Sequence, residues 1–150
     1  GSKHYVCFSH TGIKAHNDIN KDTVQTINTP SNSKVTVVIS RHRPIGIDIE
    51  TNPVAWHVAQ RFYSEHEMAA LQALCPLQRK IIAKLLWQIK ESFIKIHQYK
   101  LAQGLGIDYA YLIADLIHAI REPSSLMVIA DIKSDYRIAV LSAQQTIVIF

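Results

Sequence analysis

Residues 44–50 read Pro-Ile-Gly-Ile-Asp-Ile-Glu, and this stretch predicts a short buried strand that carries two carboxylates. Side chains alternate along a strand, so Asp48 and Glu50 would share one face and the three isoleucines the other. Two like charges side by side on a half-buried strand are costly unless a cation lies between them. Oxygen ligands of this kind favour a hard ion, Mg²⁺ first. The same pattern also fits a strand with a polar outer face and no metal.

A long helix is predicted over residues 77–100, because apolar residues recur there at helical spacing. Trp87, Glu91 and Lys95 lie four residues apart and form one ridge on this helix. A Glu–Lys pair at this spacing is common on exposed helices, so the ridge alone does not indicate a site. The apolar positions are Ile81, Ile82, Leu85, Leu86, Ile89, Phe93 and Ile96.

Together, the two segments resemble one family. Gly-Ile-Asp-Ile-Glu at 46–50 is followed, about forty residues later, by Trp-Gln-Ile-Lys-Glu-Ser-Phe-Ile-Lys at 87–95. This pair is similar to the signature of the 4'-phosphopantetheinyl transferases. It is closer to the larger, surfactin-synthetase-activating type than to the small trimeric holo-synthases. The resemblance runs from about Phe8 to the C-terminus and is weak before Lys34. It implies an α+β fold in which a mainly antiparallel sheet packs on one long helix.

The resemblance also implies an activity. The protein would transfer the 4'-phosphopantetheine group of coenzyme A to a serine of an apo acyl- or peptidyl-carrier protein and release 3',5'-ADP. Asp48, Glu50 and Glu91 would hold Mg²⁺. Glu91 would alternatively act as the base that accepts the serine proton, and these two roles compete. Lys95 would stabilise or protonate the leaving phosphate, and Lys90 would hold phosphate charge.

The family usually carries Ser-His-Ser or Ser-His-Thr one hairpin before the carboxylate strand, where the histidine contacts a coenzyme A phosphate. Ser9-His10-Thr11 fits by composition. Counting back from the carboxylate strand instead places the motif at 29–33, with Ser31 at the histidine position and Lys14 as the family's Gly-Lys-Pro lysine. Ser31 and Lys14 would then face coenzyme A, and the histidine would be missing. We favour this alignment, and a long insertion after His10 is the alternative.

The chain is interpreted as one domain at 3–150 after a cloning scar, Gly1-Ser2, because this length suffices for a hydrophobic core. Compared with the two-half family members, residues 3–43 would be a remnant of the N-terminal half and 44–150 a complete C-terminal half. Three alternatives to a self-contained enzyme follow: a homo-oligomer, a complex with a partner chain, and a degenerate protein that only binds coenzyme A or a carrier protein. A fourth is an unrelated basic domain with an accidental match.

The composition excludes several classes of protein. Apolar residues make up 48% and charged residues 19%, as in ordinary globular domains. No apolar run approaches the roughly 18 residues of a membrane span, and no leader opens the chain. Cys7 and Cys75 lie far apart, which favours reduced thiols and a cytoplasmic location. The histidines show no zinc-type spacing.

The net charge of +4 indicates an anionic partner. Nucleic acid is not expected, because no binding motif and no basic run with interleaved aromatics is present. Six basic residues concentrate around the predicted long helix. They would form either a solvated face or a surface for coenzyme A phosphates and an acidic carrier protein. These residues are Arg79, Lys80, Lys84, Lys90, Lys95 and Lys100.

Strands are predicted on both sides of the helical segment. The strand at 35–40 should pair with the carboxylate strand as an antiparallel hairpin through a turn at 41–44. Residues 114–120 fit helix and strand equally by periodicity, and the family resemblance favours a strand. The other predicted strands lie at 3–9, 23–27, 109–113, 126–132, 136–141 and 146–150.

Helix boundaries are predicted from capping residues. Asn52-Pro53 should begin a helix that runs to about Arg61. Ser64-Glu65-His66-Glu67 forms a capping box for a second helix that Pro76 would end. Glu67 also matches the family's aromatic-Ser-x-x-Glu box. It is therefore predicted to have either a structural role, which we favour, or a role in the active site. Gly104 and Gly106 would close the long helix.

Overall fold

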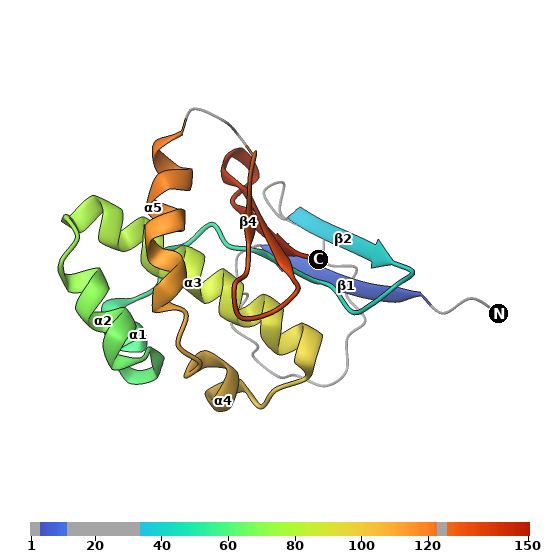
Figure 1. Ribbon diagram of the computed structural model, residues 1–150, viewed down its shortest axis with the longest axis horizontal. Coiled ribbons are helices and arrows are strands. Elements are labelled where there is room, and N and C mark those ends of the chain that lie inside the picture. Colours follow the sequence, from blue (N-terminus) through green and yellow to red (C-terminus); the bar gives the residue numbers. More distant parts are fainter. Residues whose placement is uncertain (1–3, 12–33, 123–125) are drawn as a thin grey trace, which may run out of the picture.

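The longest helix of the protein, α3 (Pro76–His97), organises the remaining elements. The structure is a computed structural model that describes residues 4–11, 34–122 and 126–150. Pro76 occupies the first turn of α3, where its missing N–H is not needed, and Gln98 ends the helix in the left-handed conformation (φ 55°). In Figure 1, α1 (Trp56–Phe62) and α2 (Glu65–Gln72) lie near its N-terminal half, and β1 (Tyr5–Thr11) and β2 (Lys34–Ser40) extend beyond its C-terminal half.

The described strands form two antiparallel sheets. The larger has the order β3-β6-β5-β4, and the smaller is the β1–β2 pair. In the larger sheet, Asp48 lies opposite Ile147, and Ile138 lies opposite both Ile149 and Ile129. The remaining elements are β3 (Gly46–Ile49), α4 (Leu101–Leu105), η1 (Ala110–Leu112), α5 (Ile113–Arg121), β4 (Leu126–Ala130), β5 (Arg137–Leu141), η2 (Ser142–Gln144) and β6 (Thr146–Ile149).

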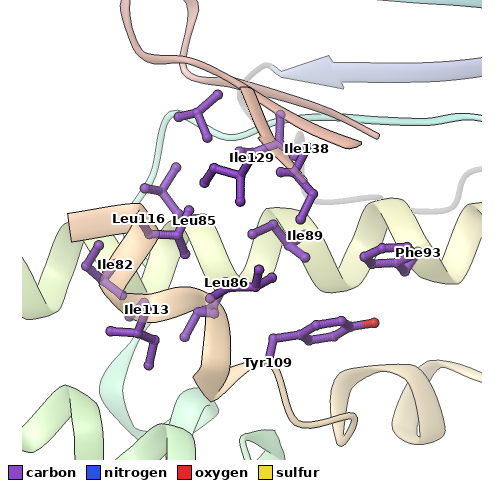
Figure 2. Packing of buried hydrophobic residues seen from close by; sticks show 14 of the residues in the cluster. Ile82, Leu85, Leu86, Ile89, Phe93, Tyr109, Ile113, Leu116, Ile129 and Ile138 are labelled. Atoms are coloured by element: carbon purple, nitrogen blue, oxygen red, sulfur yellow. The ribbon is translucent and has the colours of Figure 1, made fainter. Parts of the chain in front are cut away.

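The core lies between α3, α5 and the inner face of the larger sheet (Figure 2). Each fully buried aliphatic side chain contributes about 1.5–3 kcal/mol. The mainly antiparallel sheet on one long helix confirms the predicted α+β class. None of the described helices is long and apolar enough to cross a membrane. The α3 residues of the core are Ile82, Ala83, Leu85, Leu86, Ile89, Phe93 and Ile96.

The predicted hairpin between 35–40 and the carboxylate strand is wrong. β2 pairs with β1, and β3 pairs with β6. The segment between β2 and β3 is drawn toward the larger sheet because Arg43 binds Asp135 at 2.7 Å and stacks on the Tyr136 ring at 3.9 Å. Tyr136 in turn donates a hydrogen bond to the carbonyl oxygen of Pro44 (3.0 Å). These contacts join β3 to the larger sheet.

The strands predicted at 109–113 and 114–120 are also wrong, because this region forms η1 and α5. The carboxylate of Asp108 accepts the Ala110 N–H (2.9 Å) and starts the helical turn. Ile113, Leu116 and Ala119 then recur at helical spacing and are buried. The opposite side of this short helix carries Asp115, His118 and Arg121, so the helical period was present but was outweighed by the family resemblance.

Two helix boundaries differ from expectation. α1 begins at Trp56 with Ala55 as its N-cap, because the Asn52 N–H donates to Glu50 Oε1 (3.0 Å) and does not start a helix. Pro76 begins α3 and does not end α2, whose last residue is Gln72. α3 stops at His97, so Gly104 and Gly106 lie in and after the separate helix α4. The strand predicted at 23–27 lies outside the described residues.

Candidate active site

The carboxylate strand β3 packs directly on α3. Gly46 permits this, since a Cβ atom at that position would lie 2.5 Å from the carbonyl oxygen of Ser92. Ile47 and Ile49 are buried, as expected. Asp48 is also buried, with 9% of its surface exposed, so the strand does not have the solvated outer face that simple alternation allowed.

Asp48 lies where several charges meet. Its Oδ1 atom is 3.7 Å from Lys95 Nζ, and its Oδ2 atom is buried without a hydrogen-bond partner among the described residues. Burial raises the pKa of Asp48 to about 7; Lys95 opposes this rise, and the carboxylates of Glu91 and Glu50 add to it. The structure therefore brings Asp48 together with Glu50, Glu91 and Lys95.

Lys95 ties three segments together. Its Nζ atom donates to the carbonyl oxygens of Ile47 on β3 (2.7 Å) and Phe8 on β1 (3.1 Å). An ammonium group has three donors, so one remains for Asp48 or for a bound anion. The side chain comes from the same helix face as Glu91, one turn away.

Glu50 and Glu91 border Asp48 and are half-buried. Glu50 Oε1 accepts the Asn52 N–H, which fixes the carboxylate just after the end of β3. Burial lowers the pKa of Lys84, and the nearby Glu50 carboxylate opposes that effect, which places a lysine beside Glu50. The site is thus a group of carboxylates with cations at both ends.

A model of the 4'-phosphopantetheinyl transferase superfamily matches residues 44–146, which include all of β3 and α3. The chain belongs to the 4'-phosphopantetheinyl transferase superfamily.

Two curated proteins of this kind are similar to the chain over a shorter stretch. A 4'-phosphopantetheinyl transferase of Bacillus subtilis is 48% identical over 54 residues. The 4'-phosphopantetheinyl transferase Sfp of Bacillus subtilis strain 168 is 44% identical over 54 residues. Each alignment covers 35% of this chain and 24% of the relative. The aligned part of the chain thus spans about a quarter of the length of these relatives. No solved structure matches the chain significantly.

The superfamily implies a divalent metal, and the donors around Asp48 fit one type of metal site. In the described part of the chain, no three His, Cys, Asp or Glu side chains already stand in a metal-holding arrangement. Mg²⁺, however, is usually bound by one or two carboxylates together with substrate phosphates and waters. Among the described residues, Asp48 Oδ2 is buried without a hydrogen-bond partner and lies beside two further carboxylates, which matches that open type of site.

Lys90 does not reach the site, contrary to the prediction that it holds phosphate. Its ammonium is fully buried and donates to Glu67 Oε1 (2.8 Å) and to the carbonyl oxygens of Leu105 (2.7 Å) and Ile107 (2.6 Å). Burial lowers the pKa of Lys90, and Glu67 opposes that shift. All its donors are used inside the protein, so Lys90 is a structural residue.

Glu67 shows why the aromatic-Ser-x-x-Glu box matters. The capping box with Ser64 is present at the start of α2, as predicted. Glu67 is fully buried, and besides Lys90 it accepts the Tyr109 N–H (3.1 Å). It therefore joins α2, α3 and the segment before η1. Its structural reading is supported.

The expected phosphate-binding segment lies partly outside the described residues. Ser31 and Lys14 are among the residues that the structure does not describe. The hairpin that precedes β3 in the chain is formed by β1 and β2, and β1 lies beside β3 because Ser9 Oγ accepts the Ile49 N–H (2.8 Å). Ser9-His10-Thr11 therefore occupies the strand next to the carboxylates, which supports the alternative alignment with an insertion after His10.

Gln88 is a residue of the site that sequence reasoning missed. It is completely buried on α3, and its side-chain amide contacts the backbone of β3. The only available signal was an uncharged polar residue within the apolar face of the predicted helix, between Leu85 and Ile89.

Proposed function

We propose that the protein transfers the 4'-phosphopantetheine group of coenzyme A to a serine of an apo acyl- or peptidyl-carrier protein. The observation that supports this is the meeting of Asp48 on β3 and Glu50 just after it with Glu91 and Lys95 from α3, within a superfamily of such transferases. Phosphoryl-type transfer needs mainly positioning and neutralisation of charge, and this arrangement of carboxylates and an ammonium group provides both.

The roles of the residues follow from their chemistry. Glu91 accepts the proton of the carrier serine hydroxyl, whose oxygen then forms a bond to the β-phosphorus of coenzyme A. The bond between that phosphorus and the bridging oxygen breaks, and 3',5'-ADP leaves with the bonding electrons. The third N–H of Lys95, which lies toward Asp48, stabilises this leaving phosphate. Mg²⁺ held by Asp48, with Glu50 and Glu91 as further ligands, would neutralise pyrophosphate charge.

The phosphate-binding segment is proposed to include His10. β1 lies beside β3, and Lys95 connects the two strands through the carbonyl oxygens of Phe8 and Ile47. The backbone of β1 runs beside the strand that carries Asp48, and this placement supports the proposal. Ser31 and Lys14 stay predictions from the sequence.

The carrier protein is the proposed macromolecular partner. Carrier proteins of this kind present acidic surfaces, and Lys80 and Lys84 remain at least partly exposed on α3. Arg79 is not part of this surface, because it donates to the carbonyl oxygens of Leu71 and Leu74 at the end of α2.

Intact-mass spectrometry of an apo carrier protein incubated with the chain, coenzyme A and Mg²⁺ tests the proposal. We expect a mass gain of one phosphopantetheine that requires Mg²⁺ and is lost in Glu91→Gln. Glu65→Gln is the matched control, because Glu65 is an exposed carboxylate on α2 away from β3. Absence of transfer to several carriers while coenzyme A still binds would overturn the proposal and identify a degenerate binding protein.

A further inference from the structure

Gln88 makes two hydrogen bonds that join separate parts of the site. Its Nε2 atom donates to the carbonyl oxygen of Asp48 (3.2 Å) and to that of Gln145 (2.8 Å). Both partners are carbonyl oxygens, so the contacting atom must be the amide nitrogen and not Oε1. We call these two hydrogen bonds the Gln88 clamp. It links α3 to the end of β3 and to the turn between β5 and β6.

The clamp acts where the β3–β6 ladder ends. The carbonyl oxygen of Gln145 also accepts the Glu50 N–H (3.2 Å), while the Gln145 N–H turns back to Ser142 (3.2 Å). Gln145 itself adopts the left-handed conformation (φ 49°). The backbone at Glu50 is therefore held to the turn through one carbonyl oxygen, which Gln88 fixes from the helix side.

Two side chains of α3 hold consecutive carbonyl groups of β3. Gln88 binds the carbonyl oxygen of Asp48, and Lys95 binds that of Ile47. Glu91 lies between them on the helix, three residues after Gln88 and four before Lys95, so all three share one side of α3. The position of Asp48 relative to Glu91 is thus set by contacts on both sides of Glu91.

A packing role alone does not explain an amide here. Gln88 Oε1 is buried without a hydrogen-bond partner among the described residues, and such an atom is costly. An apolar side chain of similar shape would fill the same space without that cost. What an apolar side chain cannot supply is the pair of N–H donors directed at β3 and its neighbouring turn.

We infer that Gln88 is a positioning residue for the transferase reaction. Through the Gln88 clamp it holds the carboxylates of Asp48 and Glu50 in register with Glu91. The inference rests on the proposed function. Gln88 does not touch the reacting atoms; it acts through the backbone of Asp48 and, by way of Gln145, of Glu50.

The test compares Gln88→Met, which keeps the shape and removes the donors, with Ile82→Val, which loosens the packing of α3 in a core cluster that includes no residue of β3. Gln88→Asn is a second variant, since its amide is one methylene too short to reach both carbonyl oxygens. We expect a loss of about 10–100-fold in kcat for both Gln88 variants, because small misplacements of reacting groups cost this much. The KM for the carrier protein should stay unchanged, and the Mg²⁺ concentration for half-maximal turnover should rise.

A second readout uses the ligand-free protein and needs no activity. Hydrogen exchange measured by NMR should show faster exchange of the Glu50 amide in Gln88→Met and Gln88→Asn, but not in Ile82→Val. If the wild type transfers the group, the proposed function stands. If the Gln88 variants then have the same kcat and the same Mg²⁺ dependence as the control, the inference about Gln88 is overturned. If the wild type shows no transfer, the proposed function fails, and unchanged exchange at Glu50 would then overturn the clamp itself.

Discussion

Asp48 is the carboxylate of the candidate site whose ionisation the fold changes most clearly. Burial raises its pKa in the folded protein to about 7, far above that of an exposed aspartate. Between about pH 4 and pH 7 the folded protein therefore holds a proton that the unfolded chain has lost. The free energy of unfolding should fall as pH rises through this window. Above about pH 7, the folded protein bears the full cost of burying the ionised Asp48 carboxylate.

Replacing Asp48 by asparagine removes this dependence. We expect Asp48→Asn to be more stable than the wild type at pH 8 without Mg²⁺, by on the order of 2–4 kcal/mol, and similar to it near pH 4. Urea unfolding at several pH values in EDTA measures the difference. A constant difference at every pH would contradict the raised pKa.

Lys90 offers a second prediction at this scale, because its structural and phosphate-binding roles have different consequences. Removing one partner of a buried ion pair leaves an uncompensated charge and costs about 3–5 kcal/mol. We expect Lys90→Met to lose that much stability in urea unfolding, since Glu67 is completely buried. Lys80→Met, at an exposed position of the same helix, is the control. Unchanged stability with weakened coenzyme A binding would restore the phosphate-binding role.

At the scale of elements, the contact between β3 and α3 positions the carboxylates. A Cβ atom at Gly46 would meet the Ser92 backbone at 2.5 Å, so Gly46→Ala must push the strand from the helix. We expect a loss of about 1–3 kcal/mol together with reduced transfer. Gly106→Ala is the matched control, because its nearest neighbour, the carbonyl oxygen of Ala102, lies at 3.4 Å. Equal urea midpoints for the two variants would show that the contact is not tight.

The elements that were predicted correctly are those with strong local signals. The apolar period of α3 and the Ser64–Glu67 capping box depend on neighbouring residues, and both are present. The pairing of β2 depends on distant partners, since Arg43 and Tyr136 attach the segment before β3 to the larger sheet. α5 is short, and although its apolar residues Ile113, Leu116 and Ile120 lie on one face at helical spacing, the family resemblance favoured a strand there. Non-local contacts of this kind leave no pattern in a single segment.

The same distinction applies to the candidate site. Asp48, Glu91 and Lys95 could be found because their spacing matches a family signature, and the structure brings them together. Lys90 stands beside Glu91 in that signature, yet only its burial against Glu67 shows that it faces the interior. Gln88 left only a weak signal, a polar residue within an apolar helix face, because its partners Asp48 and Gln145 are distant in sequence.

At the scale of the whole molecule, the β1–β2 pair presents an apolar face. Val6 lies opposite Ile39 and Phe8 opposite Val37, and these four side chains are 46–63% exposed. Apolar clusters on a surface usually mark interaction sites. We expect self-association through this face, in line with the homo-oligomer considered from the sequence.

Sedimentation velocity over a range of concentrations measures this association. The double variant Phe8→Ser, Ile39→Thr should weaken it, because it removes one residue from each cross-strand pair. Ile132→Ser is the control, since Ile132 is 81% exposed but lies in the loop after β4. A monomer at every concentration would contradict the expectation.

The central claim is that the carboxylates of β3 and α3 act as one site for coenzyme A and Mg²⁺, and a double-mutant cycle measured by calorimetry tests it most directly. Coenzyme A affinity would be measured with and without Mg²⁺ for the wild type, Asp48→Asn, Glu91→Gln and the double variant. We predict that Mg²⁺ tightens binding about tenfold or more in the wild type, that each single variant loses most of this gain, and that the double variant loses little more. Strictly additive losses, or no effect of Mg²⁺ on the wild type, would contradict the claim.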